Sequence, residues 1–207
     1  MLELFKRMPK VMNNEAQFKH SGYVVIRNMI TTDEAARLYH YTLNKLTLGN
    51  SDDGQVPGSP SFYQDKEVAK LQKKLAPLIE EAIQIPLISV FCYHRIYRTG
   101  AVLRMHKDSM RAEISATMNL GQKGEPWELW LVDYDENPQN IKLYPGDVLI
   151  YYGNRLHHWR GKLLNSDLVS QIMFHFVSRN FKNAIYAKSE IIRKIRKRCR
   201  EWMGIAY

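Results

Sequence analysis

The stretch LISVFCYHRIYRTGAVLRMHKDSMRAEISATMNLG, Leu87–Gly121, decides which fold this sequence can form. Apolar and β-branched residues fill three short segments of it, and turn signals such as Thr99-Gly100 separate them. The hydrophobic period within these segments is about two, which is typical of β-strands. We therefore expect Leu87–Gly121 to form the first three strands of a β-rich core.

The same strand-like pattern continues beyond this stretch towards the C-terminus. The expected strands, in chain order, are LISVFCYHRIYR, AVLRMHKD, EISATMNLG, WELWLVDYD, NIKLY, DVLIYYG, LHHWRG and LVSQIMFHFV. Turn signals such as Pro145-Gly146 lie between them. About eight short strands at this spacing favour a β-sandwich or a β-barrel.

The first 85 residues have a helical period instead. The segment Gly22–Ile30 suits one early strand, and Thr31 with Glu34 has the pattern of a capping box at the start of a helix. A second helix is expected over about Asp65–Ile85, where apolar residues recur every three or four positions. Between the two helices, Leu48–Ser61 is rich in Gly, Pro, Ser and Asp, and its length suggests a lid over a binding site.

The composition is that of an ordinary globular protein. The 207 residues are 45% hydrophobic and 25% charged, which argues against disorder and against a fibrous repeat. No apolar run reaches the roughly 18 residues of a membrane span, and the first residues lack the pattern of a signal peptide, so we expect a cytoplasmic protein. Cys92 and Cys199 lie far apart, which argues against a disulfide framework and a cysteine metal cluster.

We expect a single α+β domain over residues 1–207. Residues 1–85 are expected to form a mostly helical support, residues 86–180 the β core and residues 181–207 a basic helical tail. Five of the nine net positive charges lie between Lys188 and Glu201. A helix with this charge either attracts a polyanion such as nucleic acid or an anionic membrane surface, or is simply a solvated helix face.

Candidate metal ligands lie in two of the expected strands. His106 and Asp108 are two residues apart, so on a strand their side chains would share one face, about 6.5 Å apart. His157 and His158 follow about fifty residues later on another expected strand. Two histidines and one carboxylate on a β scaffold form the facial triad of non-haem iron sites. This triad leaves coordination positions open for an oxo-acid and for dioxygen, and either His157 or His158 could complete it.

Three stretches of this sequence, in this order, resemble the 2-oxoglutarate and iron(II)-dependent oxygenases. They are YHRIYRTGAVLRMHKDSMRAEISATMNLG, LYPGDVLIYYGNRLHHWRG and SQIMFHFV, which together run from about Tyr93 to Val177. The sequence is most similar to a prolyl-hydroxylase-like branch of that family. The resemblance implies a double-stranded β-helix, or jelly-roll, core with N-terminal supporting helices, and here a basic C-terminal helix would follow it.

The resemblance also implies a set of iron ligands. The family's His-x-Asp motif corresponds to His106 and Asp108 in this sequence. In the related pattern the distal ligand is a histidine followed by Trp and Arg, which selects His158 and turns His157 away from the metal. The implied cofactors are Fe(II), the cosubstrate 2-oxoglutarate and dioxygen.

The sequence departs from the family where a cation usually binds the distal carboxylate of 2-oxoglutarate. Family members commonly place a Lys or Arg about ten residues beyond the distal histidine, but Leu168 stands there. We expect Arg160, two residues after His158, to take this role, and Arg104 is the second candidate. Tyr97 resembles the tyrosine that often contacts the oxo-acid in this family.

The resemblance implies an enzyme that hydroxylates a C–H bond. A protein residue such as proline is the first expected substrate, and a nucleic acid held by the basic tail is the alternative. A small-molecule substrate is also possible. The competing function from another class is a non-catalytic β-helix module that binds nucleic acid. The intact His106, Asp108 and His158 argue against that module.

Overall fold

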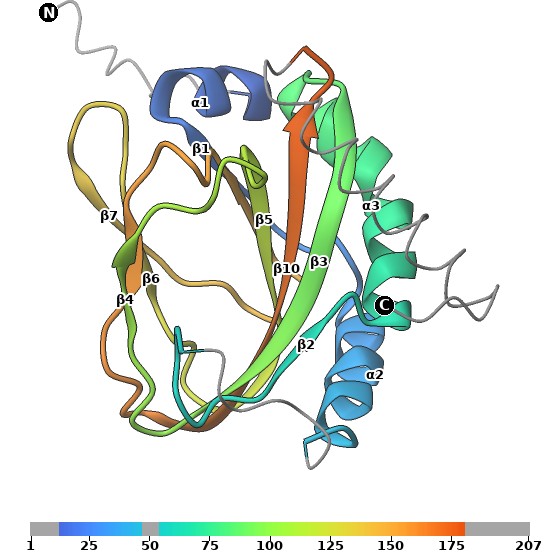
Figure 1. Ribbon diagram of the computed structural model, residues 1–207, viewed down its shortest axis with the longest axis vertical. Coiled ribbons are helices and arrows are strands. Elements are labelled where there is room, and N and C mark those ends of the chain that lie inside the picture. The colour runs from blue at the N-terminus through green and yellow to red at the C-terminus, as the bar shows by residue number, and fades with distance from the viewer. Residues whose placement is uncertain (1–12, 47–53, 181–207) are drawn as a thin grey trace, which may run out of the picture.

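The computed structural model of the chain describes residues 13–46 and 54–180 (Figure 1). Within these ranges the chain forms three helices and ten strands, with all three helices before the long strand β3. This order confirms the expected α+β organisation. The expected basic helix over residues 181–207 lies outside the described residues, as does Cys199.

The helices are α1 (Asn14–Ser21), α2 (Thr32–Leu43) and α3 (Lys66–Ile83). The strands are β1 (Tyr23–Ile26), β2 (Ser61–Tyr63), β3 (Leu87–Arg98), β4 (Leu103–His106), β5 (Ile114–Gly124), β6 (Leu129–Val132), β7 (Pro138–Ile141), β8 (Val148–Tyr151), β9 (His158–Arg160) and β10 (Ser166–Ser178). Each of the eight strands expected from the sequence corresponds to one of β3–β10. Helix α1 and the short strand β2 were not expected.

The strands form two antiparallel sheets that face each other, as a jelly roll requires (Figure 1). The larger sheet has the order β1-β8-β5-β10-β3-β2, and the smaller sheet has the order β4-β9-β6-β7. Long strands β3, β5 and β10 pair along most of their lengths and form the centre of the larger sheet. The double-stranded β-helix expected from the sequence is confirmed.

Helices α2 and α3 cover the outer face of the larger sheet (Figure 1). Their buried residues, such as Leu38 and Leu75, belong to one core cluster with residues of the sheet, such as Ile114 and Phe174. Burying this apolar surface is the main stabilising contribution expected of a support layer. The sheet's other face is therefore left to contact the smaller sheet.

Strand β10 illustrates how the two faces differ. Ile172, Phe174 and Phe176 belong to the core cluster beneath the helices. The alternate residues Gln171 and His175 lie on the inner face, where Gln171 contacts Arg160 of strand β9 and His175 lines a cavity. The inner face thus carries polar residues although it is buried.

The start of helix α2 forms only half of the expected capping box. The Thr31 hydroxyl accepts a hydrogen bond of 3.2 Å from the N–H of Glu34, as an N-cap residue should. The Glu34 carboxylate instead forms an ion pair of 2.8 Å with Lys74 of helix α3. The acidic residue therefore joins the two helices and does not bond back to the cap.

Two further expectations concern the loop before strand β2 and the absence of a membrane-spanning helix. The expected loop Leu48–Ser61 is described from Gly54 onward, and its last residue begins strand β2. Among the described helices, none is both long enough and apolar enough to cross a lipid bilayer.

Candidate metal centre

His106 and His158 are brought together by two paired strands of the smaller sheet. His106 is the last residue of β4, His158 is the first residue of β9, and the two are opposite each other in the strand register. Their rings lie with centroids 4.2 Å apart. Residues about fifty positions apart in the chain therefore meet because two strands pair.

Asp108 reaches the same place from outside the strand. We expected His106 and Asp108 to lie together because they would share one face of a strand. Strand β4 ends at His106, so Asp108 is not part of it and that explanation is wrong. The Asp108 N–H donates a 2.8 Å hydrogen bond to the carbonyl of Gly153, in the loop that leads to β9. This backbone contact holds the carboxylate beside the two histidines.

The three side chains converge on one point. One ligand atom from each of His106, Asp108 and His158 lies within 4.8 Å of the other two. The Nε2 atoms of His106 and His158 are each 3.6 Å from Oδ1 of Asp108. A single ion placed among these atoms would reach all three.

Backbone carbonyls orient both imidazole rings. The Nδ1 atom of His106 lies 2.8 Å from the carbonyl of Arg104, and Nδ1 of His158 lies 3.0 Å from the carbonyl of Leu156. Each Nδ1 must donate in these bonds because a carbonyl only accepts. Nε2 of each ring is therefore the atom directed at Asp108, and in the neutral ring it carries the lone pair that a metal ion would take.

Polar contacts also hold the carboxylate of Asp108. Its Oδ2 accepts a 2.6 Å hydrogen bond from the Ser115 hydroxyl, which lies 3.0 Å from Nδ1 of His175. Burial alone would raise the pKa of Asp108, but the two nearby histidines hold that pKa well below its usual range. Burial lowers the pKa of His175 to about 4, so this ring is neutral near pH 7. Because the Ser115 hydroxyl donates to Asp108, it accepts its second hydrogen bond from Nδ1–H of His175.

His157 lies outside this cluster. Its side chain is exposed, and its carbonyl accepts a 2.9 Å hydrogen bond from Val132 of strand β6. His158, in contrast, is 2% exposed and points at Asp108. The geometry therefore favours His158 over His157 as the distal ligand.

A cavity between the two sheets adjoins the cluster. Its lining residues are Gln55, Tyr93, Tyr97, Leu103, His106, Asp108, Thr117, Leu129, Tyr151, His158, Arg160, Met173 and His175. Six of these thirteen residues are aliphatic or tyrosine, and the other seven are polar or charged, so polar groups converge on this cavity.

Arg160 is the buried cation of this cavity. Its guanidinium donates to the carbonyl of Trp127 and, over 3.2 Å, to Oε1 of Gln171. Burial lowers its pKa to about 10, so the group stays charged at neutral pH. Among the described residues, no carboxylate forms an ion pair with Arg160. A buried cation without an anionic partner is costly, and an anionic ligand would remove that cost.

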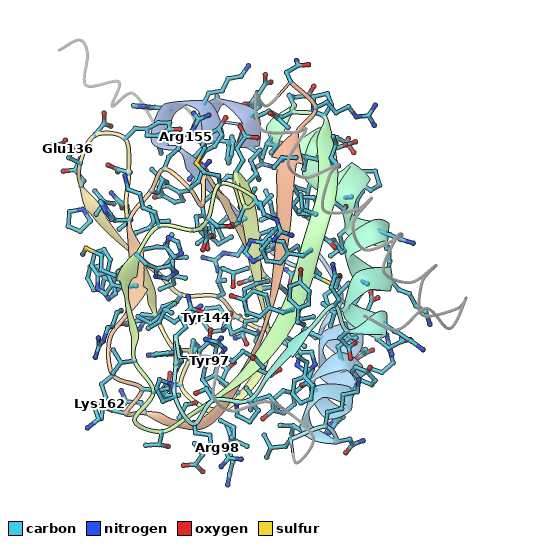
Figure 2. The ribbon with its side chains drawn as sticks, in the orientation of Figure 1. Tyr97, Arg98, Glu136, Tyr144, Arg155 and Lys162 are labelled. Carbon is cyan, nitrogen blue, oxygen red and sulfur yellow. The ribbon has the colours of Figure 1, made fainter. Side chains whose placement is uncertain are left out.

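The other two cosubstrate candidates differ in position. Tyr97 is buried, lines the cavity and contacts Trp127 edge-on, with ring centroids 4.9 Å apart. Figure 2 shows Tyr97 between the sheets and its neighbour Arg98 at the outer edge. Arg104 is exposed and lies outside the cavity lining. Strand alternation alone would put Arg104 on the face of His106, but the pairing of β4 with β9 is irregular between Leu103 and His106, and these two residues line the cavity instead.

Sequence reasoning missed several residues of the site. Gln55 comes from the expected lid, and its Nε2 lies 3.3 Å from Nε2 of His106. Its Oε1 accepts a 3.2 Å hydrogen bond from Arg95 of strand β3. Ser115 and His175 were missed because their roles depend on the pairing of β5 with β10. Only the period of two in these strands could have placed them on the inner face.

The sequence matches no protein-family model and no curated protein. Solved structures do resemble the fold. A prolyl-4-hydroxylase from Pseudomonas putida has a TM-score of 0.63 at 15% identity, over 77% of this chain and 95% of that chain. The non-haem α-ketoglutarate-dependent epimerase SnoN from nogalamycin biosynthesis has a TM-score of 0.67 at 13% identity, over 79% of this chain and 80% of that chain.

A third structure contains ligands. HygX from Streptomyces hygroscopicus, with nickel, 2-oxoglutarate and hygromycin B bound, has a TM-score of 0.61 at 15% identity, over 79% of this chain and 86% of that chain. The described chain thus has the fold of the 2-oxoglutarate and Fe(II)-dependent oxygenases, including the prolyl hydroxylases.

Proposed function

We propose that this protein is an Fe(II)- and 2-oxoglutarate-dependent dioxygenase that hydroxylates a C–H bond. The observation that carries the proposal is the convergence of His106, Asp108 and His158 beside a buried cavity. Two neutral imidazoles and one carboxylate are the donor set of non-haem Fe(II) oxygenases. The ionised carboxylate of Asp108 and the two Nε2 atoms directed at it fit a divalent ion, which would take the place of any proton on Nε2.

A bound Fe(II) ion would supply the coupled oxidation of substrate and cosubstrate. In that reaction 2-oxoglutarate and dioxygen become succinate and carbon dioxide, and one oxygen atom enters the substrate C–H bond. The chain's own part is to bind and orient. We assign Arg160, a buried cation that lines the cavity, to hold the distal carboxylate of 2-oxoglutarate by charge-assisted hydrogen bonds. Tyr97, on the neighbouring wall, would limit the orientation of the oxo-acid.

Part of the cavity wall is apolar or aromatic. Leu103, Leu129 and Met173 line it together with Tyr93 and Tyr151. A dry, low-dielectric site strengthens the interaction of Arg160 with an anion. Ser115 keeps Asp108 in one orientation, so that Oδ1 stays directed at the histidines.

For the substrate, a protein residue such as proline is the first to test. The likeness to a prolyl-4-hydroxylase supports it. The other two neighbours reported above are described with nogalamycin biosynthesis and with hygromycin B, which supports a small molecule as well. A nucleic acid is the alternative that the basic residues between Lys188 and Glu201 favour, and these lie outside the described residues.

The direct test is the formation of succinate from 2-oxoglutarate by the Fe(II)-loaded protein, with and without a chelator. We expect chelator-sensitive succinate formation in the parent protein and in His157→Ala, and none in His158→Ala. Proline-containing peptides are then screened for the gain of one oxygen atom by mass spectrometry. A folded parent protein that binds neither iron nor 2-oxoglutarate would contradict the proposal and favour the non-catalytic module.

A further inference from the structure

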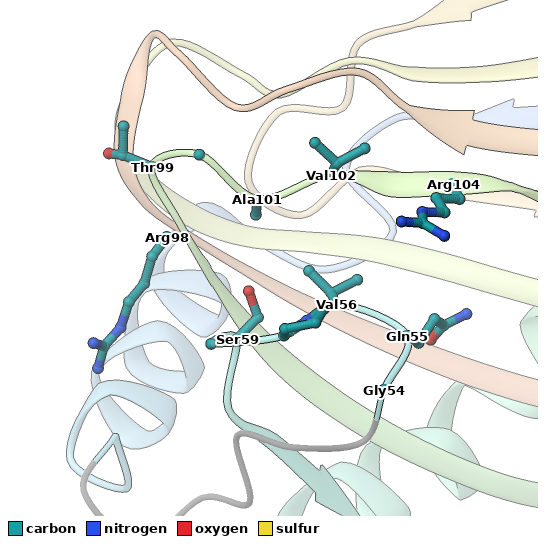
Figure 3. Close-up of a pocket in the computed structure, with 12 residues that line it drawn as sticks. Gly54, Gln55, Val56, Ser59, Arg98, Thr99, Ala101, Val102 and Arg104 are labelled. Carbon is teal, nitrogen blue, oxygen red and sulfur yellow. The ribbon is translucent and has the colours of Figure 1, made fainter.

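A second cavity, shown in Figure 3, shares the lining residue Gln55 with the cavity at the metal centre. Its volume is about 590 Å³, which is within the usual range of ligand sites. Its walls are the segment Gly54–Ser59 on one side and the turn Arg98–Val102 with Arg104 on the other. This outer cavity is therefore large enough for a ligand of its own.

The outer cavity has cationic ends and an apolar middle. Figure 3 shows Arg98 and Arg104 at opposite ends, with Val56 and Val102 between them. No acidic residue is among the described residues that line it. Neither guanidinium forms an ion pair with a carboxylate in the described part of the chain. The charge of Arg104, which Figure 3 shows directed towards Val102, is thus available to a ligand in the cavity.

Gln55 connects the outer cavity to the metal centre. It is the one described residue that lines both cavities, and its amide is 3.3 Å from His106 Nε2. Arg104 lies two residues before His106, and its carbonyl fixes the His106 ring. The end of a ligand that lies at Gln55 in the outer cavity would therefore be close to His106 and the metal centre.

We propose that the outer cavity binds the substrate and that this substrate is anionic, with an apolar body and a carboxylate or phosphate held by Arg104. Arg98 lies at the far end, where its side chain is directed away from Val56 and Ser59 (Figure 3). This inference rests on the proposed function, because it places the substrate's reacting C–H bond beyond Gln55, at the metal. An acidic peptide and a small amphiphilic acid share this chemistry.

The test uses the nickel(II)-loaded protein with saturating 2-oxoglutarate, whose binding is measured first. Two matched pairs of probes are then titrated by calorimetry. One pair is octanoate and octanamide, and the other is acetyl-Asp-Val-Pro-Asp-amide and its Asn counterpart. We expect each anion to bind more tightly than its neutral partner, and this preference to fall about three- to tenfold in Arg104→Gln.

The control variant is Arg37→Gln, which removes the same charge from an exposed position of helix α2, behind the larger sheet. It should keep the preference of the parent protein. Tighter binding of the peptide pair would assign the substrate to proteins, and tighter binding of octanoate would assign it to small acids. Normal binding of nickel and 2-oxoglutarate with no anion preference, or a preference that survives Arg104→Gln, would overturn this inference alone. Failure to bind nickel and 2-oxoglutarate would overturn the proposed function as well.

Discussion

At the scale of single residues, Arg160 is the side chain whose replacement should separate cosubstrate binding from metal binding. Its guanidinium lies in the inner cavity and has only neutral partners among the described residues. Arg160→Gln removes a buried charge-assisted contact worth about 1.5 to 3 kcal/mol, so the Kd for 2-oxoglutarate should rise roughly ten- to a hundredfold. Iron affinity should change little. Calorimetry with each ligand measures both effects.

Arg104→Gln is the matched comparison, because Arg104 was the second candidate for this role. It is exposed and outside the inner cavity. If Arg104→Gln weakens 2-oxoglutarate binding and Arg160→Gln does not, the assignment of the cation is wrong.

Individual residues of the site were predictable where the strand pattern is regular. In strand β9 the sequence His158-Trp159-Arg160 alternates, and the first and third residues are buried while Trp159 is half-buried. Alternation therefore places Arg160 on the face of His158. In strand β4 the same rule fails for Arg104, because the irregular pairing before His106 breaks the alternation. Such an irregularity depends on the partner strand and has no signature within β4 itself.

At the scale of elements, the loop between β8 and β9 must approach the residues after β4 closely. Gly153 is where they meet: a Cβ there would overlap the Ser115 hydroxyl and Oδ2 of Asp108. Gly153→Ala should therefore displace the carboxylate, lower iron affinity by about tenfold or more, and destabilise the fold by roughly 1 to 3 kcal/mol. Iron titration and urea denaturation measure the two effects.

Gly161→Ala is the control at the other end of β9, where an added Cβ has no neighbour within 4 Å. It should leave both quantities close to those of the parent protein. Unchanged iron affinity in Gly153→Ala would show that the orientation of Asp108 does not depend on this contact.

Among the elements, the long strands and helices α2 and α3 were predicted by their periods, whereas the shortest elements were not. Helix α1 has eight residues and strand β2 has three, which is too short for either period to emerge. The first eight residues of β5 are all buried, so the sequence alone does not tell its two faces apart. The contacts of Ser115 with Asp108 and His175 therefore became visible only in the folded chain.

At the scale of the whole molecule, buried histidines should make stability depend on pH, and His94 is such a histidine away from the metal centre. His94 is fully buried against Phe62, and within the described part neither ring nitrogen has a hydrogen-bond partner. Burial lowers its pKa from 6.5 to about 4. Between these values the unfolded chain binds the extra proton, so stability is complete above about pH 6.5 and falls as the pH drops towards 4. The loss from this group reaches about 3 kcal/mol.

His94→Phe keeps the stacked ring and removes the titration. Urea denaturation at pH 7 and pH 4.5 should show a smaller loss of unfolding free energy in this variant than in the parent protein. The exposed His20→Gln should reproduce the parent profile. Equal acid sensitivity of His94→Phe and the parent protein would contradict the role given to burial.

The basic C-terminal residues lead to a prediction about partners. Five of them are to be neutralised together: Arg193, Lys194, Arg196, Lys197 and Arg198. If a polyanion is the partner, its binding should weaken steeply as salt rises, with a shallower slope in the neutralised variant. Turnover of 2-oxoglutarate without substrate should stay nearly unchanged, because screened charges act over only about 8 Å at physiological salt. If polyanion binding depends neither on salt nor on these substitutions, the basic residues have no role in it and form only a solvated surface segment.

The most direct test of iron binding by His106, Asp108 and His158 is an anaerobic titration of the protein with Fe(II) in the presence of 2-oxoglutarate, followed by visible absorption. The parent protein and His157→Ala should bind one ion per chain and develop a weak charge-transfer band. His106→Ala, Asp108→Ala and His158→Ala should fold, as judged by circular dichroism, and show no band. A band that survives in His158→Ala and disappears in His157→Ala would contradict the site described here.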